Sequence, residues 1–248
     1  FISGGEQDVI KIEFIFKAGR WVEPAAGVSY FTATLLTKGT ASKSSFDIAR
    51  LFDQYGAHIE VSPGVDYVSV AAYMLTRDID TLLPLVIEIL TAATFPEREL
   101  AQAKTVHIQN LKINSEKISF QASKLARRNL FGENHPYGKE PEEADVQKVE
   151  RASLLGFYEN AFAGCRVIVS GKTGEPTQKN ILARLSALGN SNADAIVRHA
   201  IQPGERQVYI EKNNSVQTSL RVATRTVQRH HAQYADVLFL CHVLGGYF

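Results

Sequence analysis

Alternation of apolar and charged residues over Val9 to Lys17 predicts a β-strand with one buried face. The apolar positions are Ile10, Ile12, Phe14 and Phe16, and the charged positions between them are Lys11 and Glu13. Successive side chains of a strand point to opposite faces, so the apolar face is expected to lie against a core. Two further strands, Ala57 to Ser62 and Val65 to Leu75, are joined at Pro63-Gly64, which is typical of a hairpin.

Helical patterns fill most of the remaining sequence up to residue 188. The segment Gly27 to Lys38 has apolar residues at helical spacing, and Ser45 to Tyr55 begins with serine and is followed by Gly56, which suits a left-handed cap. The other expected elements are helices at Asp78 to Ala92, at Glu97 to about Phe131 as one long helix or a broken pair, at Asp145 to Phe162 and at Pro176 to Leu188, and a strand at Arg166 to Ser170. The predicted fold class is α+β, a mostly antiparallel sheet covered by helices.

A polar and irregular stretch divides the sequence near its last quarter. Residues 191–206 have the composition of an interdomain linker. We therefore expect one domain over residues 1–190 and the truncated start of a second, similar domain over residues 207–248. Two strands and a helix are predicted in the second part, at Gln207 to Glu211, Gln217 to Val227 and Ala232 to Leu244. This order repeats the beginning of the chain and indicates an internal repeat.

Charge balance excludes some classes of partner. The 27 basic and 26 acidic residues leave a formal net charge of +1, which argues against nucleic-acid binding and against a polybasic membrane surface. No apolar run reaches the roughly 20 residues that a transmembrane segment needs. The two cysteines, Cys165 and Cys241, fit neither a disulfide framework nor a cysteine-rich metal site. Both ends of the chain look cut, so a signal peptide would not be visible, and a bacterial periplasm or envelope and a mitochondrion-like compartment are both compatible with the sequence.

Several short motifs follow one another in a characteristic order. They are Gly19-Arg20-Trp21-Val22-Glu23-Pro24, Gly27-Val28-Ser29-Tyr30-Phe31-Thr32-Ala33-Thr34, Leu51-Phe52-Asp53-Gln54-Tyr55-Gly56, His135-Pro136-Tyr137-Gly138, Phe157-Tyr158 and Leu244-Gly245-Gly246. The series resembles the pitrilysin/insulinase family of zinc peptidases, in particular the branch of mitochondrial processing peptidase. The resemblance covers nearly the whole chain.

The resemblance implies a zinc site whose residues are replaced in this sequence. Active members have the inverted motif His-x-x-Glu-His on one helix, where two histidines bind zinc and the glutamate activates a water. The matching positions here are Tyr30, Ala33 and Thr34, and the family's third ligand, a glutamate, matches Asn110, with a supporting acid at Ala103. Tyrosine and threonine hydroxyls are poor substitutes for imidazole, and alanine accepts no proton. We therefore expect no metal, no cofactor and no catalysis by this chain alone.

The family also implies how such a chain works without zinc. Non-catalytic members pair with an active zinc-peptidase homologue, as a separate chain or a fused half, and enclose a chamber for unfolded peptides. Peptides add as an extra strand to an edge strand, which matches Ala57 to Ser62, so Ile59, Glu60 and Val61 are the expected contacts. Gly245 and Gly246 match a mobile glycine loop of the family, although a simple helix C-cap would also need glycine.

Two other functions remain open at the level of sequence. The first is a structural scaffold, which resembles the core proteins of the respiratory cytochrome bc complex. The second is an active zinc endopeptidase with an unfamiliar site. His58 and Glu60 share one face of a predicted strand and His107 lies on the long helix, so these three are the residues from which a replacement metal site would have to be built.

Overall fold

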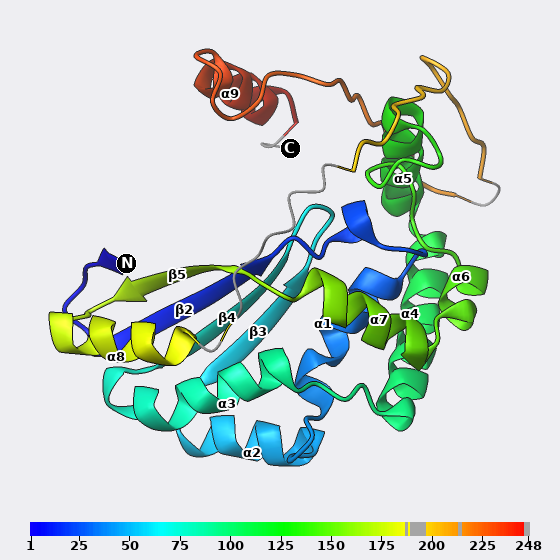
Figure 1. Ribbon diagram of the computed structural model, residues 1–248. Coiled ribbons are helices and arrows are strands. Elements are labelled where there is room, and N and C mark those ends of the chain that lie inside the picture. The colour runs from blue at the N-terminus through cyan, green and yellow to red at the C-terminus, as the bar shows by residue number, and fades with distance from the viewer. Residues whose placement is uncertain (187, 189–196, 213–214, 246–248) are drawn as a thin grey trace. The chain divides into compact units, whose positions relative to one another are not determined.

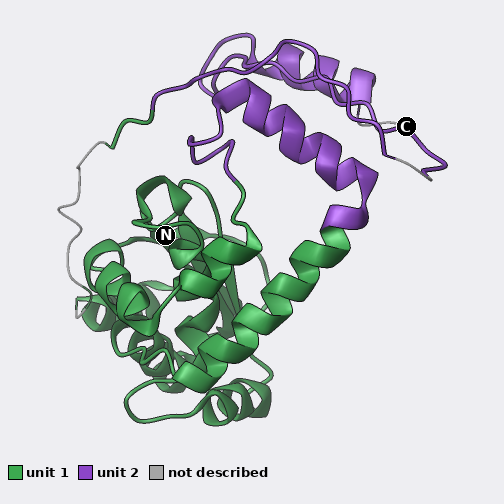
Figure 2. Cartoon of the chain, turned by 90° about the vertical axis from the view of Figure 1, so that its right-hand side faces the viewer, with its two compact units in different colours: residues 1–114, 140–199 green, residues 115–139, 200–248 purple. Residues whose placement is uncertain are grey.

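The computed structural model describes residues 1–186, 188, 197–212 and 215–245 (Figure 1). The chain forms two compact units, shown in different colours in Figure 2. Unit 1 contains residues 1–114 and 140–199, and unit 2 contains residues 115–139 and 200–248. The division into a domain of residues 1–190, a linker and a second domain from residue 207 stays a prediction.

The strands of unit 1 form one sheet with the order β1-β5-β2-β4-β3. Their bounds are β1 Ile2–Ser3, β2 Val9–Phe16, β3 His58–Pro63, β4 Val68–Leu75 and β5 Arg166–Gly171. β1 runs parallel to β5, and all other neighbours run antiparallel. The α+β class with a mostly antiparallel sheet is therefore confirmed, whereas the two-residue strand β1 was not predicted.

The apolar face of the sheet lies in the core of unit 1, as the alternation predicted. Its buried residues are Ile10, Ile12, Phe14 and Phe16 from β2, Val68, Val70, Ala72 and Met74 from β4, and Val169 from β5. On the opposite face of β2 the side chains of Lys11 and Glu13 are half-buried and form an ion pair of 2.8 Å between Nζ and Oε2. The period of two that separates these faces therefore decides which side of the sheet the helices cover.

Most of the described helices belong to unit 1, which contains the sheet, and α5 and α9 belong to unit 2. Their bounds are α1 Val28–Leu35, α2 Ser45–Gln54, α3 Ile79–Thr91, α4 Glu97–Glu116, α5 Ile118–Phe131, α6 Glu143–Lys148, α7 Arg151–Ala161, α8 Glu175–Leu185 and α9 Tyr234–Gly245, with single 3-10 turns at Arg20–Val22, Leu36–Lys38 and Thr76–Asp78. Helix α1 packs against α7 and β3, and α3 packs against β4 and α8. No described helix is long and apolar enough to cross a membrane.

Local signals account for helix α2. The Ser44 hydroxyl accepts a hydrogen bond from the Asp47 amide, and the Asp47 carboxylate accepts one from the Ser44 amide, each at 3.2 Å. This reciprocal capping box satisfies two amides that an unprotected helix start would leave open. At the other end, Gly56 adopts the left-handed conformation with φ of 59°, as predicted. Both ends of α2 therefore follow from residues next to them in sequence.

Two predicted helices are interrupted in the structure. Of the two alternatives predicted for Glu97 to Phe131, the structure has the broken pair, α4 and α5, because Lys117 between them is extended with ψ of 119°. The predicted helix from Asp145 to Phe162 is divided into α6 and α7, because Val149 and Glu150 are extended. Val149 is buried in the core, so packing explains a break that the sequence pattern does not announce.

The two strands predicted at residues 207–211 and 217–227 are wrong for the described part of the chain. Residues 207–212 and 215–227 contain no strand, and their apolar side chains are exposed, including Tyr209, Ile210, Val216, Leu220 and Val222. A strand needs neighbours that accept its hydrogen bonds and cover its apolar face, and these residues have neither in the described chain. The helix predicted nearby is confirmed as α9.

Glu88, in the last turn of α3, holds the loop that follows α1. Its Oε1 accepts hydrogen bonds from Thr40 Oγ1 at 2.6 Å and Ser42 Oγ at 2.5 Å, and its Oε2 accepts one from Lys43 Nζ at 2.7 Å. The hydrogen bonds from Lys43, Ser42 and Thr40 favour the carboxylate and lower the pKa of Glu88 from 4.5 to about 2. The ionised side chain of Glu88 therefore stabilises the fold.

Replacing Glu88 by glutamine is expected to lower the free energy of unfolding at pH 7 by about 1–3 kcal/mol, because an amide loses the charge-assisted bonds. Since the pKa of Glu88 is depressed in the folded state, its contribution is complete above about pH 5 and is lost as the pH falls towards 2. Urea unfolding of both proteins across that range measures the difference. Glu159→Gln, a change on the exposed part of α7, is the control and is expected to stay within about 0.5 kcal/mol. A difference for Glu88→Gln that does not depend on pH would contradict this account.

Candidate functional site

Helix α1 carries the three positions that match the zinc motif. Ala33 is fully buried in the core, whereas Tyr30 and Thr34 are half-exposed. Tyr30 and Thr34 are four residues apart and therefore share one face of the helix. The Thr34 hydroxyl donates a hydrogen bond of 2.8 Å to the carbonyl oxygen of Tyr30. The hydroxyl proton of Thr34 is thus used within the helix.

The start of α1 is fixed by Glu23, whose role was not predicted from the sequence. Glu23 accepts hydrogen bonds of 3.1 Å from the amides of both Gly27 and Ser29. Ser29 in turn donates from its buried hydroxyl to the carbonyl oxygen of Ala18 at 2.6 Å. A carboxylate at a helix start satisfies open amides and interacts favourably with the helix dipole. A glutamate five residues before the first residue of α1 was the available signal for this role.

Helix α4 brings a histidine to this face of α1. The ring of His107 lies 4.4 Å from the ring of Tyr30 and 5.4 Å from that of Phe31, measured between centroids. Burial lowers the pKa of His107, and the nearby carboxylate of Glu140 opposes this effect only in part. At neutral pH the imidazole is therefore uncharged and belongs to a cluster with the rings of Tyr30 and Phe31, which we call the aromatic cluster.

The matched third-ligand position lies close along the same helix. Asn110 is exposed, three residues after His107, and Ala103 is half-buried one turn before it. The structure places α4 beside α1, where the ring of His107 contacts the ring of Tyr30.

These residues do not fit a zinc ion. Zinc in proteins is held by imidazole, thiolate or carboxylate, and this place offers one imidazole, two hydroxyls and an amide. Within the described ranges, no group of three His, Cys, Asp or Glu side chains could hold a metal ion. The same finding covers His58, Glu60 and His107, the residues considered for a replacement site.

Strand β3 forms one edge of the sheet, next to α1. Among the described strands it pairs with β4 alone, and α1 packs against it. Ile59 and Val61 are half-buried against the core, while the side chains of His58 and Glu60 are exposed. An edge strand has backbone amides and carbonyls directed away from the sheet, which are open to pairing with another chain. Whether Ile59, Glu60 and Val61 contact a peptide stays a prediction.

The glycine loop falls at the end of the described chain. Gly245 is the last residue of α9, and Gly246 lies outside the described residues. The role assigned to both glycines also stays a prediction.

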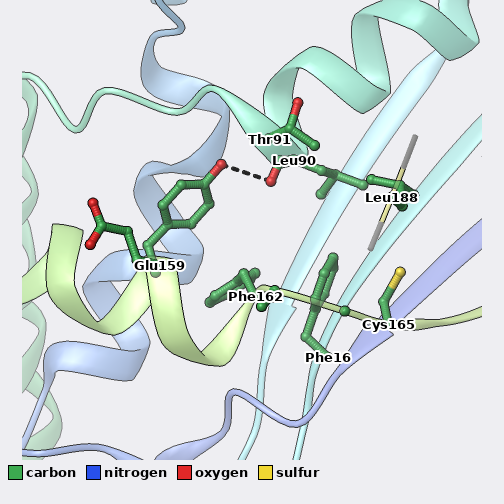
Figure 3. Close-up of a pocket in the computed structure, with 10 residues that line it drawn as sticks. Phe16, Leu90, Thr91, Glu159, Phe162, Cys165 and Leu188 are labelled. Atoms are coloured by element: carbon green, nitrogen blue, oxygen red, sulfur yellow. Dashed lines mark hydrogen bonds between the residues drawn. The ribbon is translucent and has the colours of Figure 1, made fainter. Parts of the chain in front are cut away.

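A second place in unit 1 has the shape of a cavity. About 270 Å³ of space lies between the end of α7 and the end of α3, with Phe16, Phe162, Leu90 and Cys165 in its wall (Figure 3). The Tyr158 hydroxyl, which also lies in the wall, donates to the Leu90 carbonyl oxygen at 2.7 Å. Burial raises the pKa of the Cys165 thiol to about 11. The thiol is therefore protonated at neutral pH and unsuited to nucleophilic catalysis.

Alkylation of Cys165 is expected to be slow in the folded protein. In a Cys241→Ser background, iodoacetamide at pH 7.5 should modify Cys165 on the order of 100-fold more slowly than an exposed thiol, because the thiolate is the reactive form. Mass spectrometry over time measures the rate. The same protein in guanidinium chloride is the control and should react at the ordinary rate. Equal rates in the folded and unfolded protein would show that the thiol is not protected.

Comparison with known proteins identifies the family. Residues 5–134, which include α1, β3 and α4, match the family model described as insulinase, peptidase family M16. This match extends over more than half of the chain. The chain belongs to the insulinase family. The family assignment made from the motifs is thus confirmed, and the branch of mitochondrial processing peptidase stays a prediction.

Curated members of the insulinase family are similar to the chain in sequence. An uncharacterized zinc protease of Bacillus subtilis is 23% identical over 223 residues, which are 89% of this chain and 54% of that protein. An uncharacterized zinc protease of Rickettsia felis is 28% identical over 42% of this chain and 26% of that protein. The chain thus spans about half the length, or less, of these relatives.

Solved structures of insulinase-family proteins share the fold. A crystal structure described as the inactive domain of a peptidase M16 from Pseudomonas fluorescens has a TM-score of 0.71 at 22% identity, covering 84% of this chain and 50% of that one. The crystal structure of a protease from Helicobacter pylori has a TM-score of 0.70 at 16% identity, covering 81% and 50%. At these identities the likeness concerns the fold.

Proposed function

We propose that this chain is a non-catalytic insulinase-family protein, which pairs with an active zinc-peptidase homologue and helps to hold unfolded peptides for cleavage. The observation that carries the proposal is the aromatic cluster. His107, Tyr30 and Phe31 bring their rings together where α1 and α4 meet, and Ala33 is buried in the position of the general base. A zinc-dependent reaction at this place lacks both its ligands and its base.

The edge of the sheet formed by β3 supports a role in peptide binding. In the part of the chain that the structure describes, the outer edge of β3 beside α1 has no strand partner. Pairing of a peptide with that edge relies on main-chain hydrogen bonds, which need no metal. The change in the zinc positions therefore removes hydrolysis without removing the surface to which a peptide strand would add. The description of one structural neighbour as an inactive domain agrees with this combination.

Co-purification from the native source tests the pairing. The full-length protein carrying an affinity tag is expected to retain a homologue that has His-x-x-Glu-His, identified by mass spectrometry. The two proteins mixed together should cleave unfolded peptides, and a chelator should abolish that cleavage because the zinc belongs to the partner.

Three results would contradict the proposal. Recovery of the protein with a membrane complex and no such homologue would favour the scaffold function. Cleavage by the protein alone, lost on chelation, would favour an active peptidase with another site. A full-length sequence without a fused active half, together with no associated homologue, would also exclude pairing.

A further inference from the structure

We propose that the open edge of β3 selects peptides in which a lysine or arginine lies opposite Glu60 and has apolar residues on both sides. This inference rests on the proposed peptide-holding function and adds a sequence preference to it. It depends on how the side chains of β3 and its neighbours are arranged in rows across the sheet.

The residues of β3 alternate between two different surfaces. Ile59 and Val61 are half-buried and pack against the core, on the side that the helices cover. His58, Glu60 and Ser62 are exposed on the other side of β3, which forms the edge of the sheet. A peptide strand that pairs with this edge has the same alternation, and residues directly opposite one another share a face. Each residue of the peptide would therefore contact side chains either on the helix-covered face or on the exposed face of the sheet.

An acidic row ends at Glu60. In the strand register Ala71 of β4 pairs with Glu60 on one side and with Glu13 of β2 on the other. Glu13 is neutralised by Lys11, whose Nζ lies 2.8 Å from its Oε2. Glu60 accepts a hydrogen bond of 3.2 Å from the Ser62 hydroxyl, and in the described chain no Lys or Arg forms an ion pair with it. A cation on the peptide, directly opposite, would complete this row.

The neighbouring row on the same face has a different character. Tyr73 of β4 pairs with His58 and with Lys11, and the Lys11 Nζ lies 5.7 Å from the centre of the Tyr73 ring. This row offers an imidazole and a phenol to the next exposed peptide residue and contains no carboxylate. The preference for a basic side chain is therefore confined to one position of the peptide.

The rows on the helix-covered face are apolar throughout. One row consists of Ile59, Ala72 and Ile12 on β3, β4 and β2, and the other consists of Val61, Val70 and Phe14 on the same strands. Peptide residues opposite Ile59 and Val61 would extend these rows, so burial of an apolar side chain stabilises the complex and a charged one is penalised. Since both positions flank the residue opposite Glu60, the preferred sequence is apolar, basic, apolar.

Two short peptides that differ only in the central residue test the inference. Each has valine on both sides of the centre, which is lysine in one peptide and glutamate in the other. By fluorescence anisotropy, the full-length protein is expected to bind the lysine peptide about fivefold more tightly at low salt, the size of effect that cross-strand charge pairs give. Glu60→Gln should bind the two peptides equally, and Glu60→Lys should reverse the order. Raising the salt concentration should weaken the preference.

A control variant and a measurement of where the peptide binds distinguish failure of this inference from failure of the proposed function. Glu159→Gln removes a carboxylate from α7 and should keep the preference of the wild type. Hydrogen exchange should show protection of β3 amides by the bound peptide. Protection of β3 with equal affinity for both peptides would overturn the inference and leave the peptide-holding function intact. No binding of either peptide, or binding without protection of β3, would overturn both.

Discussion

Replacing both Tyr30 and Thr34 by histidine is expected to create a zinc site between α1 and α4. The two positions share the half-exposed face of α1, and the ring of His107 already lies 4.4 Å from the ring of Tyr30. Three imidazoles would then converge, a ligand set that holds zinc in proteins. Zinc at 100 times its Kd should raise the free energy of unfolding of the double variant by about 2.7 kcal/mol. Urea unfolding with and without zinc measures this change.

Removing the third imidazole provides the control for this experiment. Adding His107→Ala to the double variant should abolish most of the stabilisation by zinc. The double variant is still expected to leave peptides uncleaved, because Ala33 has no group that could act as a general base beside the ion. Equal stabilisation by zinc with and without His107 would mean that the two histidines on α1 bind the ion by themselves and that His107 of α4 is not part of the site.

Elements defined by neighbouring residues could be predicted from the sequence. Strand β2 follows from a strict alternation, and α2 follows from Ser44 at its start and Gly56 after its end. Breaks caused by packing could not be predicted. Val149 and Glu150 interrupt a predicted helix where Val149 is buried in the core, and β1 consists of two residues that form a strand only because β5 lies beside them. The failed strands after residue 207 make the same point, because strand propensity depends on partners.

The candidate site also has features that the sequence predicts and features that depend on packing. Matching the motif identified Tyr30, Ala33 and Thr34 as replaced positions, because their spacing on one helix is local information. The contact between Tyr30 and His107 could not be predicted, since it depends on how α1 and α4 pack. A damaged motif alone leaves the alternative of a rearranged metal site open. The described residues add that the rings of Tyr30 and His107 are in contact where α1 and α4 meet, and that no group of three ligand-type side chains lies there.

Replacing Phe95 by alanine is expected to lower the free energy of unfolding by about 3–5 kcal/mol, because the side chain is fully buried between α3 and α4. Its ring meets the ring of Tyr158 edge-on at 5.2 Å between centroids. Arg151 donates from Nε to the carbonyl oxygen of Phe95 at 3.0 Å and from Nη2 to that of Thr94 at 2.9 Å. The residue therefore fixes the turn from which α4 carries His107 towards α1. Chemical denaturation measures the loss.

A matched substitution and a second replacement at the same position separate burial from backbone strain. Phe46→Ala removes the same ring from an exposed site on α2 and should change stability by less than about 0.5 kcal/mol. Phe95 has a left-handed backbone with φ of 48°, which costs about 1 kcal/mol for a residue with a Cβ atom. Phe95→Gly should therefore be as stable as Phe95→Ala or more stable, although glycine is usually the less stable of the two. A glycine variant clearly less stable than the alanine variant would show that the turn relaxes once the ring is gone, and that the ring itself imposes the left-handed conformation.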